Sequence, residues 1–229
     1  MRKTPRDRLF PGSFFCIVLG MEHDPPTPWL EWSREIQSLS QTGLAFAQTH
    51  YERVRYHRLL ELASEMVSHR TCLDSDDVLR TFQVQPGYAT VKVDVRGAVV
   101  RDDRILLVRE RTDGRWAMPG GWADVGEYPS DMISREIREE SGYEAKPVRL
   151  IGVYDANRAG RPMEFFHAYK VIFLCELTGG APAASDETSD VGFFPFDDLP
   201  SLSEHRTNQV HLLEVRRHLA DPTRPAAFD

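Results

Sequence analysis

The segment Gly121-Trp-Ala-Asp-Val-Gly-Glu127, followed after seven intervening residues by Arg135-Glu-Ile-Arg-Glu-Glu-Ser-Gly-Tyr143, carries the strongest structural signal in this chain. A glycine-rich loop runs here into a predicted helix that has glutamates at positions i, i+3 and i+4. In an α-helix these offsets place Glu136, Glu139 and Glu140 on one face, within an arc of roughly 100°. The segment therefore predicts a row of three carboxylates beside a loop whose backbone other groups can approach closely.

Three neighbouring carboxylates repel one another and destabilise an isolated helix. A divalent cation bound over their face relieves this repulsion. A set of oxygen ligands suits Mg²⁺ or Mn²⁺ rather than zinc or copper. We therefore predict that Glu136, Glu139 and Glu140 bind Mg²⁺ or Mn²⁺.

Written as a pattern, the segment is G-x5-E-x7-R-E-I-x-E-E-x-G-Y, and it resembles the Nudix box at every defined position. Nudix hydrolases cleave a nucleoside diphosphate linked to another group X. The resemblance implies an α/β class fold, the Nudix α/β/α sandwich, and makes the carbonyl of Gly121 a fourth candidate metal ligand. It also implies that Glu127 and Arg135 pair across the junction of loop and helix and so hold the catalytic geometry.

Cleavage of a phosphoanhydride also needs a group that activates water. Glu136 is one candidate within the box. Nudix enzymes that act on ADP-ribose often take this base from a loop outside the box, and the matching loop here spans residues 186–190. We favour Glu187 as the general base. The alternative, in which these acids form only a solvated turn before the last strand, stays open.

The residues before the box domain predict a small helical module. Apolar residues recur at helical spacing from residue 29, Gly43 is predicted to end this first helix, and a second helical pattern covers residues 51–67. Two helices of this length cannot bury both apolar stripes alone, so they pack on the rest of the chain or on a second copy. The stripe of the first helix consists of Trp29, Trp32, Ile36 and Leu39.

The run Trp29-Leu-Glu-Trp-Ser-Arg-Glu-Ile-Gln-Ser-Leu-Ser-Gln-Thr-Gly43, followed by Tyr51-Glu-Arg-Val-Arg-Tyr-His-Arg-Leu59, is similar to the N-terminal helical module of some bacterial Nudix proteins. Members of that subgroup are described as ADP-ribose or CDP-choline pyrophosphatases, and they dimerise. The resemblance therefore implies a homodimer formed through the N-terminal helices.

The predicted organisation has five parts, which are a disordered extension over residues 1–26, the helical module over 27–70, a linker over 71–87, the Nudix domain over 88–222 and a tail over 223–229. The linker is predicted to hold a short strand over residues 78–84. Strands are predicted over 88–100, 105–108, 148–153, 165–177 and 191–194. The final helix is predicted over 204–219, with Val210, Leu213, Val215 and Leu219 on its apolar side.

Composition excludes several classes of partner. The formal net charge of −7 argues against a dedicated nucleic-acid surface, which would need a basic stripe to neutralise phosphates. No apolar stretch approaches the length of a membrane span, and residues 1–20 imitate a signal peptide without its full apolar core or cleavage site. The three cysteines lack metal-ligand spacing and predict reduced thiols in a cytoplasmic protein.

The predicted activity is Mg²⁺-dependent hydrolysis of the pyrophosphate bond in a nucleoside diphosphate linked to X, giving a nucleoside monophosphate and X-phosphate. ADP-ribose is the first candidate substrate and CDP-choline the second. The box does not choose between them, because it contacts only the diphosphate. A 3′-exonuclease or decapping enzyme acting on RNA, and a non-catalytic nucleotide sensor, are the further alternatives. Arg158, Arg161 and His167 lie near the predicted mouth but are not assigned as site residues.

Overall fold

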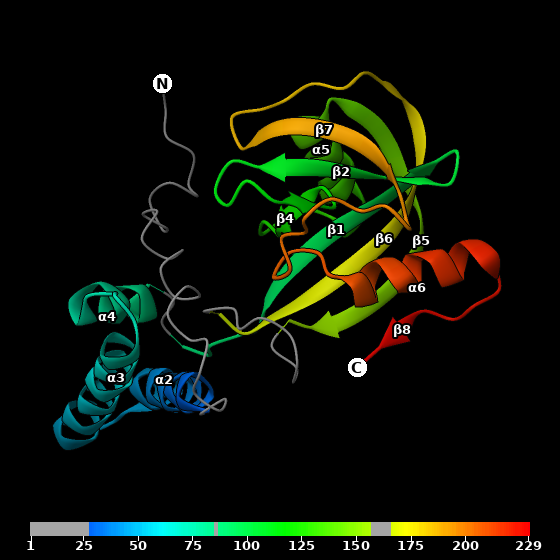
Figure 1. Ribbon diagram of the computed structural model, residues 1–229. Helices are drawn as coiled ribbons and strands as arrows, with labels where there is room; N and C mark the ends of the chain where they lie inside the picture. Colours follow the sequence, from blue (N-terminus) through cyan, green and yellow to red (C-terminus); the bar gives the residue numbers. More distant parts are fainter. Residues whose placement is uncertain (1–27, 85–86, 157–165) are drawn as a thin grey trace. The chain divides into compact units, whose positions relative to one another are not determined.

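The computed structural model describes residues 28–84, 87–156 and 166–229 of the chain (Figure 1). The chain divides into two compact units, with the boundary between Thr90 and Val91. The predicted extension over residues 1–26 lies outside the described residues, as do Arg158 and Arg161.

The described part of the first unit consists of helices α2 (Trp29–Phe46), α3 (His50–Arg70) and α4 (Ser75–Gln83). Helix α3 begins with a capping box, in which the Thr49 side chain and the Glu52 side chain satisfy each other's backbone amides. Polar side chains join the helices, since the Ser33 hydroxyl donates to the Ala63 carbonyl at 2.9 Å. The buried apolar side chains are Trp29, Leu30, Leu60, Ala63, Val67, Leu73, Val78 and Phe82.

Two predictions for this unit are wrong. Gly43 does not end the first helix, and it lies inside α2, where a Cβ atom would come within 2.3 Å of the Tyr56 ring. The glycine therefore serves close packing rather than chain reversal. The short strand predicted over residues 78–84 of the linker is part of helix α4 instead. The Asp74 side chain caps the first amides of this helix, and Val78 and Phe82 are buried one helical turn apart.

The second unit is built on a mixed sheet in which the described strands run in the order β3-β2-β1-β6-β5-β8, with β4 paired to β1 and β7 paired to β2. The pairs β1–β6 and β5–β8 are parallel, and the others are antiparallel. The strands are β1 (Lys92–Arg101), β2 (Arg104–Glu110), β3 (Trp116–Ala117), β4 (Gly120–Trp122), β5 (Tyr143–Asp155), β6 (Ala168–Gly180), β7 (Thr188–Pro195) and β8 (Ala227–Phe228).

Helices α5 (Pro129–Ser141) and α6 (Gln209–Ala220) cover opposite faces of this sheet (Figure 1). Side chains alternate along β1, so that Val95 and Val99 pack under α5 while Ala98 packs in the cluster that includes residues of α6. These layers form the predicted α/β/α sandwich. Helix α5 ends at Gly142, whose φ of 74° is readily adopted only by glycine.

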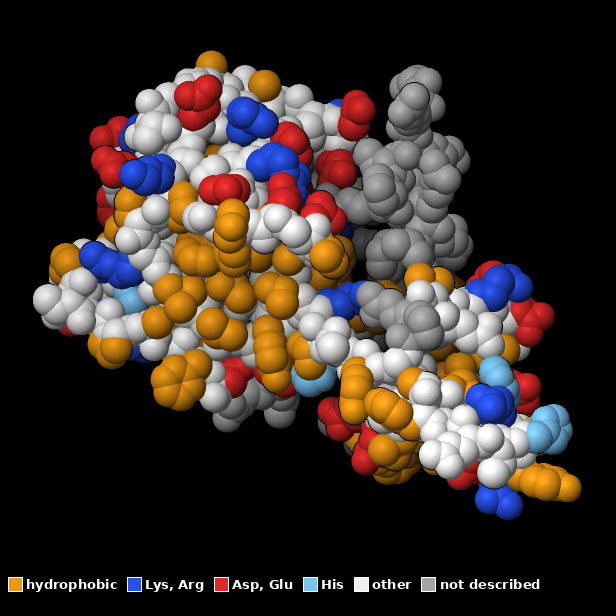
Figure 2. Space-filling view, turned by 180° about the vertical axis from the view of Figure 1, so that it is seen from behind, with side chains coloured by type: hydrophobic (Ala, Val, Ile, Leu, Met, Phe, Trp, Pro, Cys, Tyr) orange, Lys and Arg blue, Asp and Glu red, His pale blue; other side chains and the backbone are white. Residues whose placement is uncertain are grey.

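The side of the second unit seen in Figure 2 carries a broad group of hydrophobic side chains beside a region rich in charged side chains. Val93 of β1 and Tyr169 of β6 are paired neighbours on the α5 face of the sheet, and both are exposed. Helix α5 therefore covers only part of this face within the described residues.

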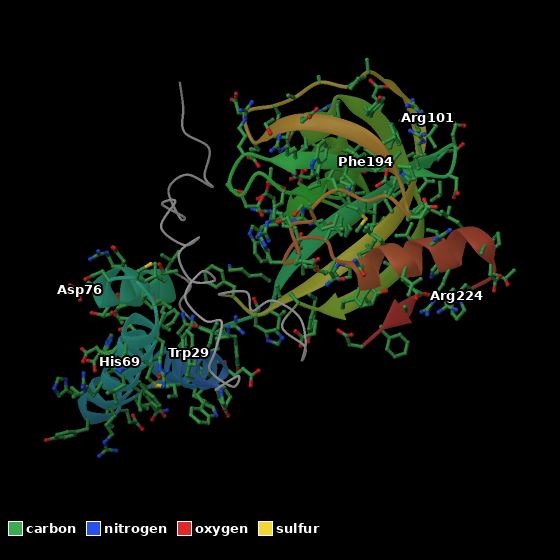
Figure 3. All side chains as sticks on the ribbon, in the orientation of Figure 1. Trp29, His69, Asp76, Arg101, Phe194 and Arg224 are labelled. Carbon is green, nitrogen blue, oxygen red and sulfur yellow. The ribbon has the colours of Figure 1, made fainter. Side chains whose placement is uncertain are left out.

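The C-terminal part of the second unit differs from prediction in two ways. Helix α6 begins only after Asn208, which caps it, and its buried face carries His211, Leu212, Glu214, Val215 and His218. The predicted apolar side is therefore wrong except for Val215, because Val210, Leu213 and Leu219 are exposed. The segment predicted as a tail over residues 223–229 instead contains β8 and packs on the domain, since Arg224, labelled in Figure 3, binds the buried carboxylate of Glu214 at 2.5 Å.

No helix in the described ranges is both long enough and apolar enough to cross a membrane. Cys72 and Cys175 are free thiols, and burial raises the pKa of the Cys175 thiol to about 12. Cys16 lies outside the described residues.

The packing of α5 on the sheet predicts a large effect of shortening Ile137, which is fully buried in the cluster beneath the helix. Ile137→Ala should lower the free energy of unfolding of the second unit by about 2–5 kcal/mol, through lost burial and an unfilled cavity. Val125→Ala, at a fully exposed position, is the control and should change it by less than about 0.5 kcal/mol. Urea unfolding followed by circular dichroism measures both, and equal effects of the two substitutions would contradict this account.

Candidate active site

The loop and helix of the box are joined by a hydrogen bond between the entering strand and the last turn of the helix. Gly120 and Gly121 lie in β4, opposite Arg96 and Val95 of β1. The Gly120 amide donates to Oε2 of Glu140 at 2.8 Å. The backbone at the start of the box is therefore bound directly by one of the three predicted metal-binding carboxylates.

Arg135 holds the loop to the first part of the helix. Its Nε and Nη2 atoms donate to the two carboxylate oxygens of Glu127 at 2.9 and 2.6 Å, which is a bidentate pair. Its Nη1 atom lies 2.9 Å from Glu139 and 3.2 Å from Glu136. The hydrogen bond from Arg135 lowers the pKa of Glu127, and the acidic surroundings raise the pKa of Arg135. The expected pairing of Glu127 with Arg135 is present in the structure.

The three glutamates of the helix differ in burial. Glu136 and Glu140 are buried, with exposed fractions of 6% and 4%, whereas half of the Glu139 side chain is exposed. Burial raises the pKa of Glu140 to about 8, and the nearby negative charge of Glu110 adds to the increase. A cation placed beside such a buried carboxyl group would stabilise its ionised form.

A buried group of charged side chains lies on β1 and β6 beside these acids. Arg96 donates to Asp94 at 2.9 Å and to the Met118 carbonyl at 3.2 Å, and Lys170 of β6 forms an ion pair with Asp94. Burial favours a raised pKa of Asp94, but the charges of Arg96 and Lys170 hold it below its ordinary value. Sequence reasoning missed these residues because polar positions in an alternating strand are normally predicted to face solvent.

Glu187 lies directly before β7, whose first residue, Thr188, contacts the last turn of α5. The Thr188 hydroxyl donates to the Glu140 carbonyl at 2.7 Å, and the Glu187 carbonyl accepts from the Arg111 amide at 3.0 Å. Residues 188–190 of the predicted acidic loop belong to β7, and Glu187 itself is half-buried. The loop is therefore attached to the helix that carries the three glutamates. His167 lies elsewhere, with Nε2 3.3 Å from Asp155.

The described residues contain no group of three or more His, Cys, Asp or Glu side chains already gathered as a metal site. One reason is that Arg135 binds Glu139 and Glu136 from the loop side. The chemistry of these side chains nevertheless fits a hard cation, since Glu136 and Glu140 supply buried carboxylate oxygens and the Glu139 carboxylate is half exposed.

A glycine-rich strand end bound to a helix that bears a row of glutamates offers oxygen atoms of the kind that hold a divalent cation. Comparison with known families agrees. Residues 91–215 match the NUDIX domain, and residues 27–82 match a module described as the UDP-X-like, N-terminal oligomerisation domain. The chain belongs to the Nudix family.

Several relatives are similar over most of the chain. A putative ADP-ribose pyrophosphatase of Bacillus subtilis, YjhB, is 39% identical over 203 residues, which is 89% of this chain and 98% of the relative. The crystal structure of a UDP-X diphosphatase is 34% identical, covers 88% of this chain and 98% of its own, and has a TM-score of 0.57. An ADP-ribose pyrophosphatase structure from Streptococcus suis is also 34% identical, covers 61% of this chain and 100% of its own, and has a TM-score of 0.57.

The protein is therefore a Nudix pyrophosphatase that hydrolyses a nucleoside diphosphate linked to X. Enzymes of this family generally use divalent metal ions. The N-terminal module is of the kind that forms oligomers.

The raised pKa of Glu140 makes the stability of the metal-free protein depend on pH. Between its ordinary pKa of 4.5 and about 8, the folded protein holds a proton that the unfolded chain has released, so stability falls as the pH rises. Burial and the charge of Arg206 lower the pKa of His205 from 6.5 to about 3. Between these two values only the unfolded chain holds the proton, so His205 makes stability rise with pH up to about pH 6.5. The effect of Glu140 therefore stands out between about pH 6.5 and 8.

We expect the melting temperature, measured with a chelator present, to decline across pH 6.5–8 in the wild-type protein. Glu140→Gln should flatten this decline, because the amide does not titrate but its oxygen can still accept from Gly120. An equal decline in both proteins would show that another group causes it.

Proposed function

We propose that this enzyme hydrolyses the pyrophosphate bond of ADP-ribose to AMP and ribose 5-phosphate, with Mg²⁺ or Mn²⁺ as the cofactor. The observation that carries this proposal is the similarity to the Bacillus subtilis protein, which is described as a putative ADP-ribose pyrophosphatase and is matched over 98% of its length. The Streptococcus suis structure, also named an ADP-ribose pyrophosphatase, supports the same substrate.

A UDP-linked compound is the second candidate. The UDP-X diphosphatase structure covers 88% of this chain, and the N-terminal module resembles the UDP-X-like type. CDP-choline, which the sequence analysis placed second, contains the same diphosphate that the box would contact, so it is tested beside the other two compounds.

In this proposal Glu136, Glu139 and Glu140 hold the cation, together with the Gly121 carbonyl. When bound, the cation would shield the charge of the substrate diphosphate and favour ionisation of the attacking water. Glu136 and Glu140 are supported as ligands by their burial on the side of α5 that faces β4. Glu139 would exchange its contact with Arg135 for the cation.

Glu127 and Arg135 would act as positioning residues. Their bidentate pair ties the loop after β4 to the second turn of α5, and thereby fixes the distance between the Gly121 carbonyl and the glutamates. Glu187 is our candidate for the general base, because its neighbour Thr188 is bonded to the last turn of the same helix. Glu136 is the alternative base within the box.

A panel of nucleoside diphosphate derivatives tests the activity. ADP-ribose, a UDP-sugar, CDP-choline, NAD-capped RNA and uncapped RNA are incubated with Mg²⁺ or Mn²⁺, and the released monophosphate is identified by chromatography. AMP from ADP-ribose, at the highest kcat/KM of the panel, is the expected result. Preferential release of UMP would establish the second candidate instead, and binding of ADP-ribose without any AMP would indicate a sensor.

Removal of the candidate base provides a sharper test. Glu187→Gln should lower kcat at least about 100-fold, because a general base typically contributes a factor of this order, and should leave Mn²⁺ affinity unchanged. Asp186→Asn changes the exposed neighbour and is the matched control, with kcat within about twofold of wild type. Near-normal turnover of Glu187→Gln would remove Glu187 from the mechanism and leave Glu136 as the candidate.

We also propose that the chain forms a homodimer through its N-terminal helices. Trp32, Leu39 and Phe46 stand seven residues apart along α2 and are 52%, 63% and 63% exposed. At 100° per residue this spacing keeps them on one stripe of the helix. The buried face of α2 instead includes Trp29 and Leu30, so the stripe is an additional apolar face that a second copy would cover.

The dimer proposal predicts the effect of one charge placed on this stripe. Leu39→Glu should shift the protein from dimer to monomer in size-exclusion chromatography with light scattering, because burying an unpaired carboxylate is costly. Ala45→Glu introduces the same charge at an exposed position of α2 away from the stripe, and should leave the dimer intact. A wild-type monomer, or a dimer that survives Leu39→Glu, would contradict this interface.

A cytoplasmic location is part of the proposal. The free thiols of Cys72 and Cys175 support it, since disulfides persist mainly in oxidising compartments.

A further inference from the structure

Glu110 is an acidic residue outside the box whose surroundings connect it to the candidate active site. It is the last residue of β2, and its exposed fraction is only 6%. Along β2, Leu106 packs in the cluster beneath α5, whereas Ile105 and Leu107 pack in the cluster on the α6 side. Because side chains alternate along a strand, Glu110 is at a position of the α5 side, where the glutamates of the box lie.

A local irregularity in the sheet brings Glu110 into register with the end of α5. Arg109 pairs with Asp190 of β7 but Glu110 pairs with Thr188, so the ladder skips one residue of β7 at this point. Such bulges change the direction of the neighbouring side chains. The Thr188 hydroxyl donates to the Glu140 carbonyl at 2.7 Å, which links the Glu110 register position directly to the last turn of α5.

Arg206 holds the Glu110 side chain from the segment before α6. Its Nε atom lies 3.3 Å from Oε1 of Glu110, and its Nη2 atom donates to the Thr112 hydroxyl at 3.1 Å. Its Nη1 atom donates to the Ser203 hydroxyl at 3.0 Å and lies 3.4 Å from Oδ2 of Asp113. These contacts fix the position of the Arg206 guanidinium. The ion pair with Arg206 in turn restricts rotation of the Glu110 carboxylate.

The balance of buried charge around Glu140 assigns Glu110 a role beyond this ion pair. Among the described residues at this site, Arg96 interacts with the carboxylates of Asp94, Glu110 and Glu140. Its neighbour Lys170 is the other buried cation and is bound to Asp94. Arg206 pairs with Glu110, and Arg135 pairs with Glu127, Glu136 and Glu139. With these partners counted, four cations face seven carboxylates, and a divalent cation would offset most of this excess of three negative charges. The cations are Arg96, Lys170, Arg135 and Arg206, and the carboxylates are Asp94, Glu110, Asp113, Glu127, Glu136, Glu139 and Glu140.

We infer that Glu110 is a further acidic residue of the divalent-cation site, supplied by β2 from outside the box and positioned by Arg206. This inference rests on the proposed metal-dependent function. Glu110 would raise the cation affinity of the glutamates on α5 through its charge and its fixed position.

Binding of Mn²⁺ to the full-length protein, measured by electron paramagnetic resonance after treatment with a chelator, tests this inference without any substrate. Glu110→Gln keeps an oxygen that can accept from Arg206 but removes the charge, and should weaken Mn²⁺ binding at least about tenfold, the lower end of the range for residues that support metal ligands. Asp113→Asn is the matched control, because it removes the other carboxylate that Arg206 binds. It should change the dissociation constant less than about twofold.

Three results would overturn the inference. One is a Glu110→Gln variant that binds Mn²⁺ like the wild type, and another is an equal loss of affinity in both variants, which would indicate a structural role shared through Arg206. The third is a Glu110→Asp variant that, although it keeps the charge, binds Mn²⁺ no more tightly than Glu110→Gln. If the Gln variant does not fold, Arg206→Lys carries the test, because it removes the guanidinium contacts that position Glu110. Weakened Mn²⁺ binding in Arg206→Lys, with wild-type affinity in Asp113→Asn, is then the expected result, and wild-type affinity in Arg206→Lys overturns the inference. Failure of the wild-type protein to bind Mn²⁺ would instead contradict the proposed function itself.

Discussion

The hydrogen bond from the Gly120 amide to the buried carboxylate of Glu140 is the contact on which the candidate site depends. A buried carboxylate needs compensation because its charge has left water. Here one compensating donor is the backbone that enters the box, so the same interaction docks α5 against β4 and places an acidic oxygen beside the glycine-rich strand end. Arg135 makes a similar connection from the second turn of the helix, where its contacts with Glu127 join the loop to α5. The geometry of the loop and the electrostatics of the acids are therefore determined together.

The charges beneath the site explain why it can remain acidic without unfolding. Arg96 and Lys170 lie on the central strands, and Arg96 also binds the Met118 carbonyl just before the box. A buried cation next to a group of carboxylates offsets part of their repulsion without removing the attraction for a divalent ion. The segment that precedes α6 contributes Arg206 to the same region. Sequence far from the box therefore supplies part of the electrostatic environment of the glutamates.

In the helical unit, part of the buried face of α2 is polar and an apolar stripe of the same helix is exposed. The buried face of α2 includes Ser33 and Gln41, whose side chains donate to carbonyl groups of α3 and α4. Polar side chains are tolerated there because their hydrogen bonds are satisfied. Apolar residues such as Trp32 and Leu39 remain exposed on another stripe of the same helix. Hydrophobic spacing correctly indicates a helix, but it does not show which stripe is covered within the chain and which is available to a partner.

The sequence by itself determined the box, whose resemblance to a known family implied the pairing of Glu127 with Arg135. It also determined the helices and main strands whose apolar residues repeat at the period of the backbone, because this periodicity depends on residues only a few positions apart. Only the tertiary structure decided that Gly43 lies within a helix, that Glu214 and His218 belong to a buried face, and that β8 joins the sheet. It also decided that Arg96 and Glu110 are buried beside Glu140. Their positions depend on pairing between segments that are distant in the sequence, and local periodicity holds no information about such pairing.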